Sequence, residues 1–178
     1  MAKTGREDEF VFEKLNQGME IEVYGIRFYT KSAENTADPR GRQTLKYLAG
    51  EEQEHLKFIN DLKKSFETRD KDTATDIARS RSAKEGHTQI FPKKAEFAET
   101  IKDDGTGKKI LFEAVEIEKR SIQFYTEALN KVEKTLHKEI FTTLLNEEKG
   151  HLELVQQMSD YMTLHGVWSG LDDYFANE

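Results

Sequence analysis

Apolar residues recur along the chain at alternating steps of three and four positions, which is the spacing of one face of an amphipathic α-helix. Four long segments follow this period, and prolines hardly interrupt them, because the chain holds only two. The pattern therefore predicts an all-α protein. The predicted helices cover residues 4–34, 39–66, 107–131 and 135–165.

Residue types at the ends of these segments support the boundaries. Thr4 and Glu7 have the Thr-x-x-Glu spacing of a capping box at the start of the first helix. Asp38 can cap the second helix, with Pro39 in its first turn, and Gly166 can end the fourth. These signals separate the second helix from the first and end the fourth before the last residues of the chain.

The two halves of the chain are similar to each other at a fixed offset of 96 residues. Residues 15–30 match residues 111–126 at eight of sixteen positions, and residues 45–56 match residues 141–152 at five of twelve. Since both matches share one offset without a gap, we infer that each half repeats the same helical hairpin. Two such hairpins are expected to pair as a four-helix bundle.

The repeat divides one predicted domain, residues 1–178, into four parts. These parts are hairpin one at 4–66, a crossover linker at 67–106, hairpin two at 107–165 and a C-terminal tail at 166–178. The linker is polar, with a possible short helix over residues 93–101, and a connection of this length is expected where the chain crosses from one end of a bundle to the other. The tail carries Trp168 and further apolar residues at a helix-like spacing, so we expect it to cover the bundle or to contact a partner chain.

Six polar residues interrupt the otherwise apolar core-facing positions of the four helices. They are Glu22, Glu52, His55, Glu118, Glu148 and His151. An unpaired buried charge costs several kcal/mol even after relaxation, and four carboxylates together would repel one another. Two divalent cations would balance the four negative charges, and two neutral imidazoles would complete the coordination. The pattern therefore predicts a buried dinuclear metal site with four Glu and two His ligands.

Composition narrows the chemistry further. The formal net charge is −7 and no basic segment stands out, which argues against a nucleic-acid partner. Cysteine is absent, so any metal must be bound by oxygen and nitrogen. No stretch approaches the 18 or so consecutive apolar residues of a transmembrane helix, so we expect no membrane partner and a cytoplasmic location.

Four motifs give the chain a family resemblance. They are EVYGIRFY at 22–29, EEQEH at 51–55, EKRSIQFY at 118–125 and EEKGH at 147–151. With these motifs the chain resembles the ferritin-like di-iron carboxylate proteins, and it is most similar to their rubrerythrin-related group. The resemblance implies a ferritin-like four-helix bundle that binds two iron ions, with manganese or zinc as alternatives.

The resemblance also implies a role for each site residue. Glu52 and Glu148 would bridge the two metals, Glu22 and Glu118 would be terminal carboxylates, and His55 and His151 would each bind one metal. Tyr29 and Tyr125 would line the site, and we interpret them as core tyrosines that hydrogen-bond to a ligand carboxylate in preference to redox groups.

Two departures from the family pattern limit what carries over. Rubrerythrin proper has a further carboxylate three residues after the third-helix ligand, whereas this chain has Ser121 there. Its C-terminal rubredoxin module needs four cysteines, and this sequence has none. Electrons would therefore come from an external donor protein or from Fe(II) itself.

Four other glutamates and three other histidines lie outside the core-facing positions. Glu20, Glu51, Glu116 and Glu147 are predicted to be solvated charges or groups behind the ligands. His87, His137 and His165 have no partner in the repeat and are predicted to lie on the surface.

The main functional hypothesis is an oxidoreductase whose di-iron centre reduces hydrogen peroxide or dioxygen. Two alternatives stay open: a ferroxidase coupled to iron storage, and a helical scaffold in which the metals are structural and no turnover occurs. A homo-oligomer is expected, with a dimer favoured because dimers are the commonest soluble assemblies.

Overall fold

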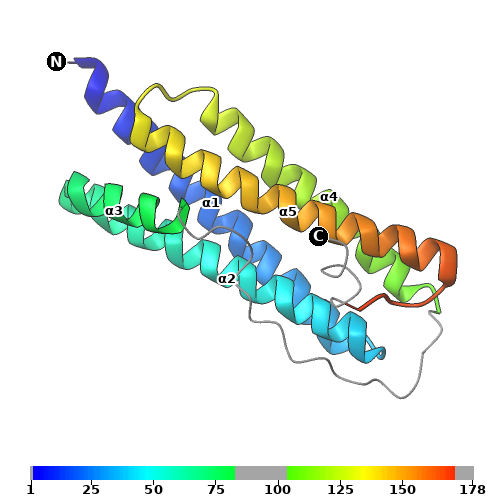
Figure 1. The fold of residues 1–178 in the computed structure, drawn as a ribbon. Helices are drawn as coiled ribbons and strands as arrows, with labels where there is room; N and C mark the ends of the chain where they lie inside the picture. The colour runs from blue at the N-terminus through cyan, green and yellow to red at the C-terminus, as the bar shows by residue number, and fades with distance from the viewer. Residues whose placement is uncertain (1, 83–103, 171–178) are drawn as a thin grey trace.

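The structure, a computed structural model, describes residues 2–82 and 104–170. Four long helices and one short helix make up this part of the chain. They are α1 (Ala2–Asn35), α2 (Pro39–Thr68), α3 (Lys71–Ser82), α4 (Thr106–Leu129) and α5 (Thr135–His165). Figure 1 shows α1 and α2 as one antiparallel hairpin and α4 and α5 as another, with the two hairpins packed side by side. The predicted all-α four-helix bundle is confirmed. The helix boundaries lie within two residues of the predicted ones.

Residues 67–106 are predicted to be a polar linker with one possible short helix over residues 93–101, but the structure places the short helix α3 at Lys71–Ser82. Asp70 accepts hydrogen bonds from the backbone N–H of Thr73 at 3.0 Å and from its hydroxyl, which starts the helix. Ala74 and Ala78 are buried one turn apart, and α3 packs with this face against α2 and α5. Two alanines are a weak hydrophobic signal, so the spacing of apolar residues does not predict this helix. The possible helix over residues 93–101 lies outside the described residues.

Two apolar clusters fill the bundle along its length, and a polar layer separates them. One cluster includes Leu48, Leu111 and Met158, and the other includes Leu15, Ile59 and Phe141. On α2, Leu48 belongs to the first cluster and Ile59 to the second, so Glu52 and His55 lie between them on the same helix face. The bundle therefore encloses its polar residues between two hydrophobic ends.

Local contacts fix the start of α2, the end of α5 and the first residues of the tail. Asp38 caps α2 as predicted, with its carboxylate accepting from the backbone N–H of Arg40 at 2.8 Å. Gly166 ends α5 in the left-handed conformation with a φ of 69°, also as predicted. Trp168 follows it and packs so closely on Gly41 that an added Cβ there would lie 2.3 Å from the indole ring. The first residues of the tail thus cover the bundle, while residues 171–178 lie outside the described part.

Glu7 does not form the predicted capping box, because α1 already begins at Ala2. Its carboxylate instead reaches the other hairpin and accepts from the backbone N–H groups of Glu133 and Lys134, both at 3.0 Å. It also contacts His137 Nδ1 at 2.8 Å. Partial burial acts to raise the pKa of Glu7, but these contacts outweigh it and lower that pKa from 4.5 to about 2. Glu7 therefore connects α1 to the start of α5.

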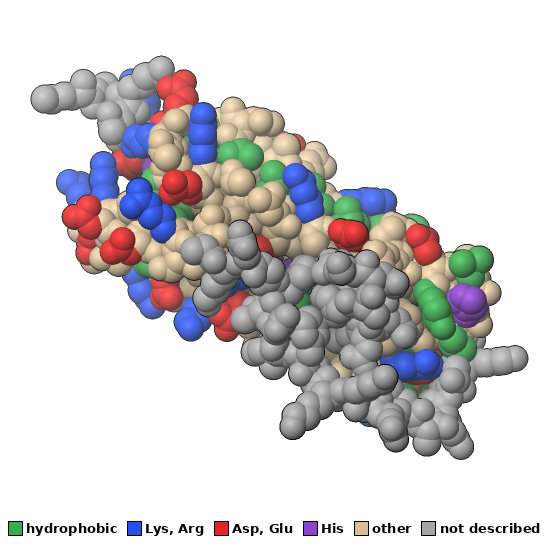
Figure 2. All heavy atoms as spheres, in the orientation of Figure 1, with side chains coloured by type: hydrophobic (Ala, Val, Ile, Leu, Met, Phe, Trp, Pro, Cys, Tyr) green, Lys and Arg blue, Asp and Glu red, His purple; other side chains and the backbone are tan. Residues whose placement is uncertain are grey.

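The surface of the described residues carries charges of both signs. On the face shown in Figure 2, acidic and basic side chains are intermingled along the helices. None of the helices in the described ranges contains an apolar stretch long enough to cross a bilayer.

Replacing Glu7 by Ala should destabilise the protein by about 1–2 kcal/mol at neutral pH, because two backbone N–H groups and His137 lose their acceptor. The difference from the wild type should shrink as the pH falls from about 4.5 toward 2, since protonation removes the Glu7 carboxylate from the wild type as well. Denaturant unfolding at several pH values measures both effects. Glu9→Ala, at an exposed position of the same helix, is the matched control, and an equal loss from both variants would refute the interhelical role of Glu7.

Candidate metal centre

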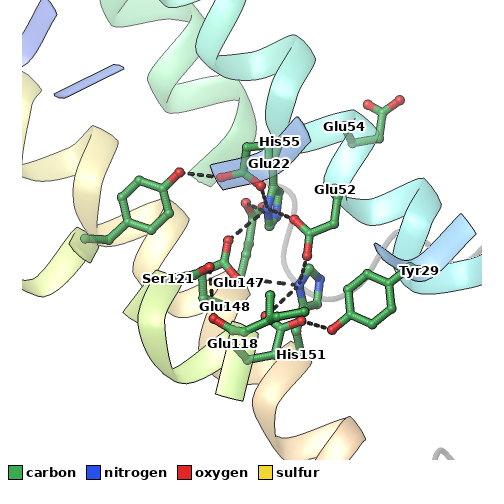
Figure 3. A network of polar contacts seen from close by, with 12 residues as sticks. Glu22, Tyr29, Glu52, Glu54, His55, Glu118, Ser121, Glu147, Glu148 and His151 are labelled. Atoms are coloured by element: carbon green, nitrogen blue, oxygen red, sulfur yellow. Dashed lines mark hydrogen bonds and ion pairs between the residues drawn. The ribbon is translucent and has the colours of Figure 1, made fainter. Parts of the chain in front are cut away.

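All six polar residues predicted from the core-facing pattern meet in one buried layer at the middle of the bundle. Each of these residues is no more than 3% exposed. They come from all four long helices: Glu22 from α1, Glu52 and His55 from α2, Glu118 from α4, and Glu148 and His151 from α5. Figure 3 shows their side chains pointing toward one another.

His55 faces three carboxylates with the same ring nitrogen. Its Nδ1 lies 3.3 Å from Glu22 Oε2, 3.2 Å from Glu52 Oε2 and 3.1 Å from Glu148 Oε1. Three oxygens from three different helices thus converge on one nitrogen.

His151 repeats this arrangement in the other half of the centre. Its Nδ1 lies 3.5 Å from Glu52 Oε1, 3.8 Å from Glu118 Oε2 and 3.9 Å from Glu148 Oε2. The His55 and His151 rings are stacked, with their centroids 5.0 Å apart. The internal sequence repeat is therefore also a repeat of the site geometry.

Glu52 and Glu148 each divide their two oxygens between the two histidines. Oε2 of Glu52 is directed at His55 and its Oε1 at His151, while Glu148 presents Oε1 to His55 and Oε2 to His151. Glu22 contacts only the His55 half and Glu118 only the His151 half among these contacts. This is the donor arrangement expected of two bridging and two terminal carboxylates.

Tyr29 and Tyr125 hold the outer oxygens of the terminal carboxylates. The Tyr29 hydroxyl donates to Glu118 Oε1, and the Tyr125 hydroxyl donates to Glu22 Oε1, so each bond crosses from one hairpin to the other. Burial is the main reason that the pKa of both phenols lies well above its usual range, which keeps the hydroxyls protonated. Each terminal carboxylate therefore has one oxygen fixed and the other directed at the centre.

Small residues let the helices approach the centre closely. A Cβ added at Gly25 would lie 3.3 Å from Glu52 Cγ, and one added at Gly18 would lie 3.0 Å from the Tyr125 hydroxyl. Ser121, at the repeat position of Gly25, is buried and donates to the backbone carbonyl of Ile117 at 3.4 Å. A larger side chain at Gly25 would press on Glu52.

The inward atoms of the cluster have no hydrogen-bond partners of their own. Buried atoms without such a partner include Glu22 Oε2, Glu118 Oε2, both oxygens of Glu148, and Nδ1 of both histidines. Leaving such groups unpaired costs on the order of several kcal/mol. Among the described residues, ligand atoms of Glu52, His55, Glu148 and His151 lie within 4.8 Å of one another, close enough to hold a metal ion. The unpaired atoms and the oxygen and nitrogen donor set fit two divalent ions of iron, manganese or zinc.

Burial and mutual repulsion raise the pKa of three of the four carboxyl groups. Loss of hydration, followed by repulsion from Glu52, raises the pKa of Glu22 to about 8. Burial, followed by the charges of Glu52 and Glu22, raises the pKa of Glu148 to about 8 as well. Burial also raises the pKa of Glu118 well above its usual range, with Glu52 as the next cause. Without a cation these three groups therefore hold protons near neutral pH.

The pKa values of Glu52 and the two imidazoles move in the opposite sense to the effect of burial. Burial would raise the pKa of Glu52, but the facing His151 and His55 rings hold it well below its usual range. Burial would lower the pKa of His55, but the surrounding carboxylates, Glu147 foremost, raise it well above its usual range. Glu52 likewise raises the pKa of His151. The cluster thus carries protons where metal ions would supply positive charge, so metal binding must release protons.

The residues predicted to lie outside the cluster divide into two groups. Glu20 is exposed and Glu51 and Glu116 are half-buried, which agrees with solvated positions. Glu147 differs, because its Oε2 lies 3.2 Å from His55 Nε2 while Arg81 of α3 binds it from the other side. The contact between Arg81 and Glu147 was not predicted, because Arg81 belongs to α3, which the spacing of apolar residues does not predict.

The histidines outside the cluster include one wrong prediction. His165 is exposed as predicted. His137 was predicted to lie on the surface, but it is only 1% exposed, because Glu7 and the Phe66 ring pack against it. His87 lies outside the described residues.

The fold and the site together have the layout of a ferritin-like dimetal carboxylate protein. Two Glu-x-x-His motifs and two more glutamates surround a buried centre in a four-helix bundle. The comparison with protein families agrees. The family model described as Rubrerythrin matches residues 13–159, which is most of the chain, so the protein belongs to the rubrerythrin family. The comparisons with curated proteins and with solved structures found no match.

The metal-free protein should lose thermal stability as the pH rises from 6.5 to 8. The pKa values of Glu22 and Glu148 are about 8 instead of 4.5, and that of His151 is raised above 6.5, so the folded state binds more protons than the unfolded state in this window. Stability falls with rising pH wherever that is the case. Calorimetry in the presence of a chelator measures the change.

A matched pair of variants isolates the cluster as the cause. Glu148→Gln replaces a proton-binding carboxyl group by a neutral amide and should flatten the pH dependence, whereas Glu20→Gln, at an exposed position, should leave it unchanged. A melting temperature of the wild type that rises over this window would show that Glu22, Glu148 and His151 do not hold protons as described.

Proposed function

We propose that the protein is a di-iron oxidoreductase that reduces hydrogen peroxide or dioxygen. The observation that supports this most strongly is the pair of imidazoles whose Nδ1 atoms each face three carboxylate oxygens, with Glu52 and Glu148 shared between them. Two iron ions bound there would supply one electron each on passing from the ferrous to the ferric state. Two electrons and two protons convert hydrogen peroxide to two water molecules. The same two electrons and two protons convert dioxygen to hydrogen peroxide, and a second pair of electrons from the external donor completes its reduction to water.

The ligand roles in this proposal follow the oxygen directions. Glu52 and Glu148 would be shared by the two ions, Glu22 and His55 would complete one half, and Glu118 and His151 would complete the other. Four carboxylates and two neutral imidazoles would balance two divalent ions in charge, which would offset both the burial and the mutual repulsion that raise the pKa of Glu22 and Glu148. Protons leave these carboxyl groups as the ions enter.

Tyr29 and Tyr125 act as positioning residues in the proposed reaction. Their hydroxyl protons hold Oε1 of Glu118 and Glu22, which keeps Oε2 of each carboxylate directed at the centre. The apolar clusters on both sides exclude water from the rest of the layer.

One surface groove is lined by Ser121, which neighbours the proposed ligand Glu118 on α4. It lies between α1 and α4, has a volume of about 330 Å³, and is lined in part by Ile21, Tyr24, Ile117 and Ser121. Ser121 follows the proposed ligand Glu118 by one helical turn. A small oxidant could approach the layer from this side, which favours a reactive centre over a closed structural one.

The electrons must reach the centre from outside this sequence. The chain contains no cysteine and therefore no residues for the rubredoxin iron site that the resemblance would otherwise imply. An external electron-donor protein, or Fe(II) as a substrate, completes the cycle in this proposal.

Replacing Glu52 or Glu148 by Ala should abolish binding of the metal pair, because each residue supplies an oxygen to both halves of the centre. Glu20→Ala should retain two ions per chain, since Glu20 is exposed and lies outside the cluster. Elemental analysis after loading and desalting measures the stoichiometry. Equal metal loss in all three variants would show that the ligands have been wrongly assigned.

The protein is loaded with Fe(II) without oxygen and then mixed rapidly with hydrogen peroxide. The ferric product should absorb in the near ultraviolet. A parallel experiment with dioxygen compares the rates of the two oxidants. Faster oxidation by peroxide would identify a peroxidase, and faster oxidation by dioxygen an oxidase or ferroxidase. The Glu148→Ala variant serves as the control for iron in solution. A loaded wild type that reacts with neither oxidant would rule out the proposed function.

A further inference from the structure

Arg81, in the last turn of α3, binds a carboxylate at the edge of the metal centre. Its Nε donates to Glu147 Oε1 at 2.9 Å and Oε2 at 3.2 Å, and its Nη2 donates to Oε2 at 3.2 Å. Glu147 lies on α5, 66 residues further along the chain. The two hydrogen-bonding nitrogens hold both carboxylate oxygens, which fixes the orientation of the Glu147 head group.

Arg81 is itself fixed by two further contacts. Its Nη1 donates to the backbone carbonyl of Glu54 at 3.3 Å, and its guanidinium carbon lies 5.4 Å from the centre of the Phe58 ring. Both partners belong to α2, so Arg81 joins α2 to α5 through α3. Its side chain is only 12% exposed, which limits competition from water. The small buried residues Ala74 and Ala78 let α3 pack closely enough for this contact.

Glu147 in turn faces the outer nitrogen of a proposed metal ligand. Its Oε2 lies 3.2 Å from His55 Nε2, on the opposite side of the ring from the Nδ1 that faces Glu22, Glu52 and Glu148. His55 is fully buried, and its Nε2 has no hydrogen-bond partner among the described residues, so the contact with Glu147 is an ion-pair distance that a small rotation of the ring would convert into a hydrogen bond. Within the described residues, Glu147 is the polar group recorded at this nitrogen.

The other half of the centre lacks this support. The repeat equivalent of Glu147 is Glu51, which precedes Glu52 on α2 just as Glu147 precedes Glu148 on α5. In the described part of the chain no contact joins Glu51 to His151, and the contacts of His151 with carboxylates all involve its Nδ1. The pseudo-symmetry of the two halves therefore ends at the outer nitrogen of the histidines.

We propose that Arg81 and Glu147 position His55 and make the His55 half of the centre the tighter of two unequal metal sites. This inference rests on the proposed function, because it concerns ligands of the two metal ions. A carboxylate that accepts the Nε2–H of a metal-binding histidine fixes the ring tautomer, leaves the Nδ1 lone pair free for the metal and makes that nitrogen a stronger donor. Removing such a partner weakens metal binding by roughly 10- to 100-fold. The short helix α3 would thereby raise the affinity for one ion of the pair and not for the other.

The test is a stepwise titration of the metal-free protein with Mn(II) by calorimetry at fixed pH. The wild type should bind two ions with different affinities. Glu147→Gln should weaken the tighter step about 10- to 100-fold and leave the weaker step close to its wild-type value. Arg81→Ala should change the same step in the same direction by a smaller factor, because Glu147 then remains present but is no longer held.

Glu51→Gln is the matched control, since it makes the same change at the repeat position, where the described residues show no contact with a histidine. Circular dichroism confirms that each variant is folded. An unchanged tighter step in Glu147→Gln, or an equal effect of Glu51→Gln, would overturn the proposed role of Glu147 while leaving the dimetal centre intact. A wild type that binds fewer than two ions would overturn the dimetal centre, and this inference with it.

A second readout follows the ring directly. In zinc-loaded protein with ¹⁵N-labelled histidine, the Nε2–H of His55 should be protected from exchange in the wild type and should exchange faster in Glu147→Gln. The resonances of His151 should not change. Equal exchange of His55 in both proteins would contradict the proposed hydrogen bond. Faster exchange at both histidines would indicate a general loosening of the fold and would contradict it as well.

Discussion

Four carboxylates and two imidazoles enclosed between two hydrophobic clusters are the constraint that organises this bundle. Unpaired, these groups cost free energy, and the raised pKa values of Glu22 and Glu148 show how the cluster reduces that cost by holding protons. Two divalent ions would meet the same need better, because they would balance the charge and give the inward atoms a common partner. The rest of the layer supports this arrangement: tyrosines from opposite hairpins orient the terminal glutamates, and Gly25 gives Glu52 the room it needs.

The chain builds this centre by repeating one helical hairpin and then breaks the symmetry with an added element. Glu52 and Glu148 occupy equivalent positions and each contacts both histidines, so the inner part of the centre follows the repeat. The helix α3 has no counterpart in the second hairpin within the described residues, and it delivers Arg81 to one side only. The two proposed metal positions therefore share their bridging ligands but differ in what holds the histidine.

The sequence was sufficient to predict the four long helices and all six residues of the cluster, because heptad-like spacing and a gapless repeat of 96 residues depend on local periodicity and need no tertiary information. Contacts between distant parts of the chain were not predictable in this way. Glu7 has the spacing of a capping box but binds the start of α5, and His137 is buried because Glu7 and Phe66 cover it. The short helix α3 depends on two small alanines and on its packing against α2 and α5, so its periodicity alone was too weak to detect.

The most direct test of this account is an anomalous-diffraction experiment at the iron edge on crystals loaded anaerobically with Fe(II). The account predicts two anomalous peaks per chain, one beside Nδ1 of His55 and one beside Nδ1 of His151, with Glu52 and Glu148 between them. A single peak, or peaks only at surface carboxylates, would contradict the dinuclear centre and with it the proposed oxidoreductase function.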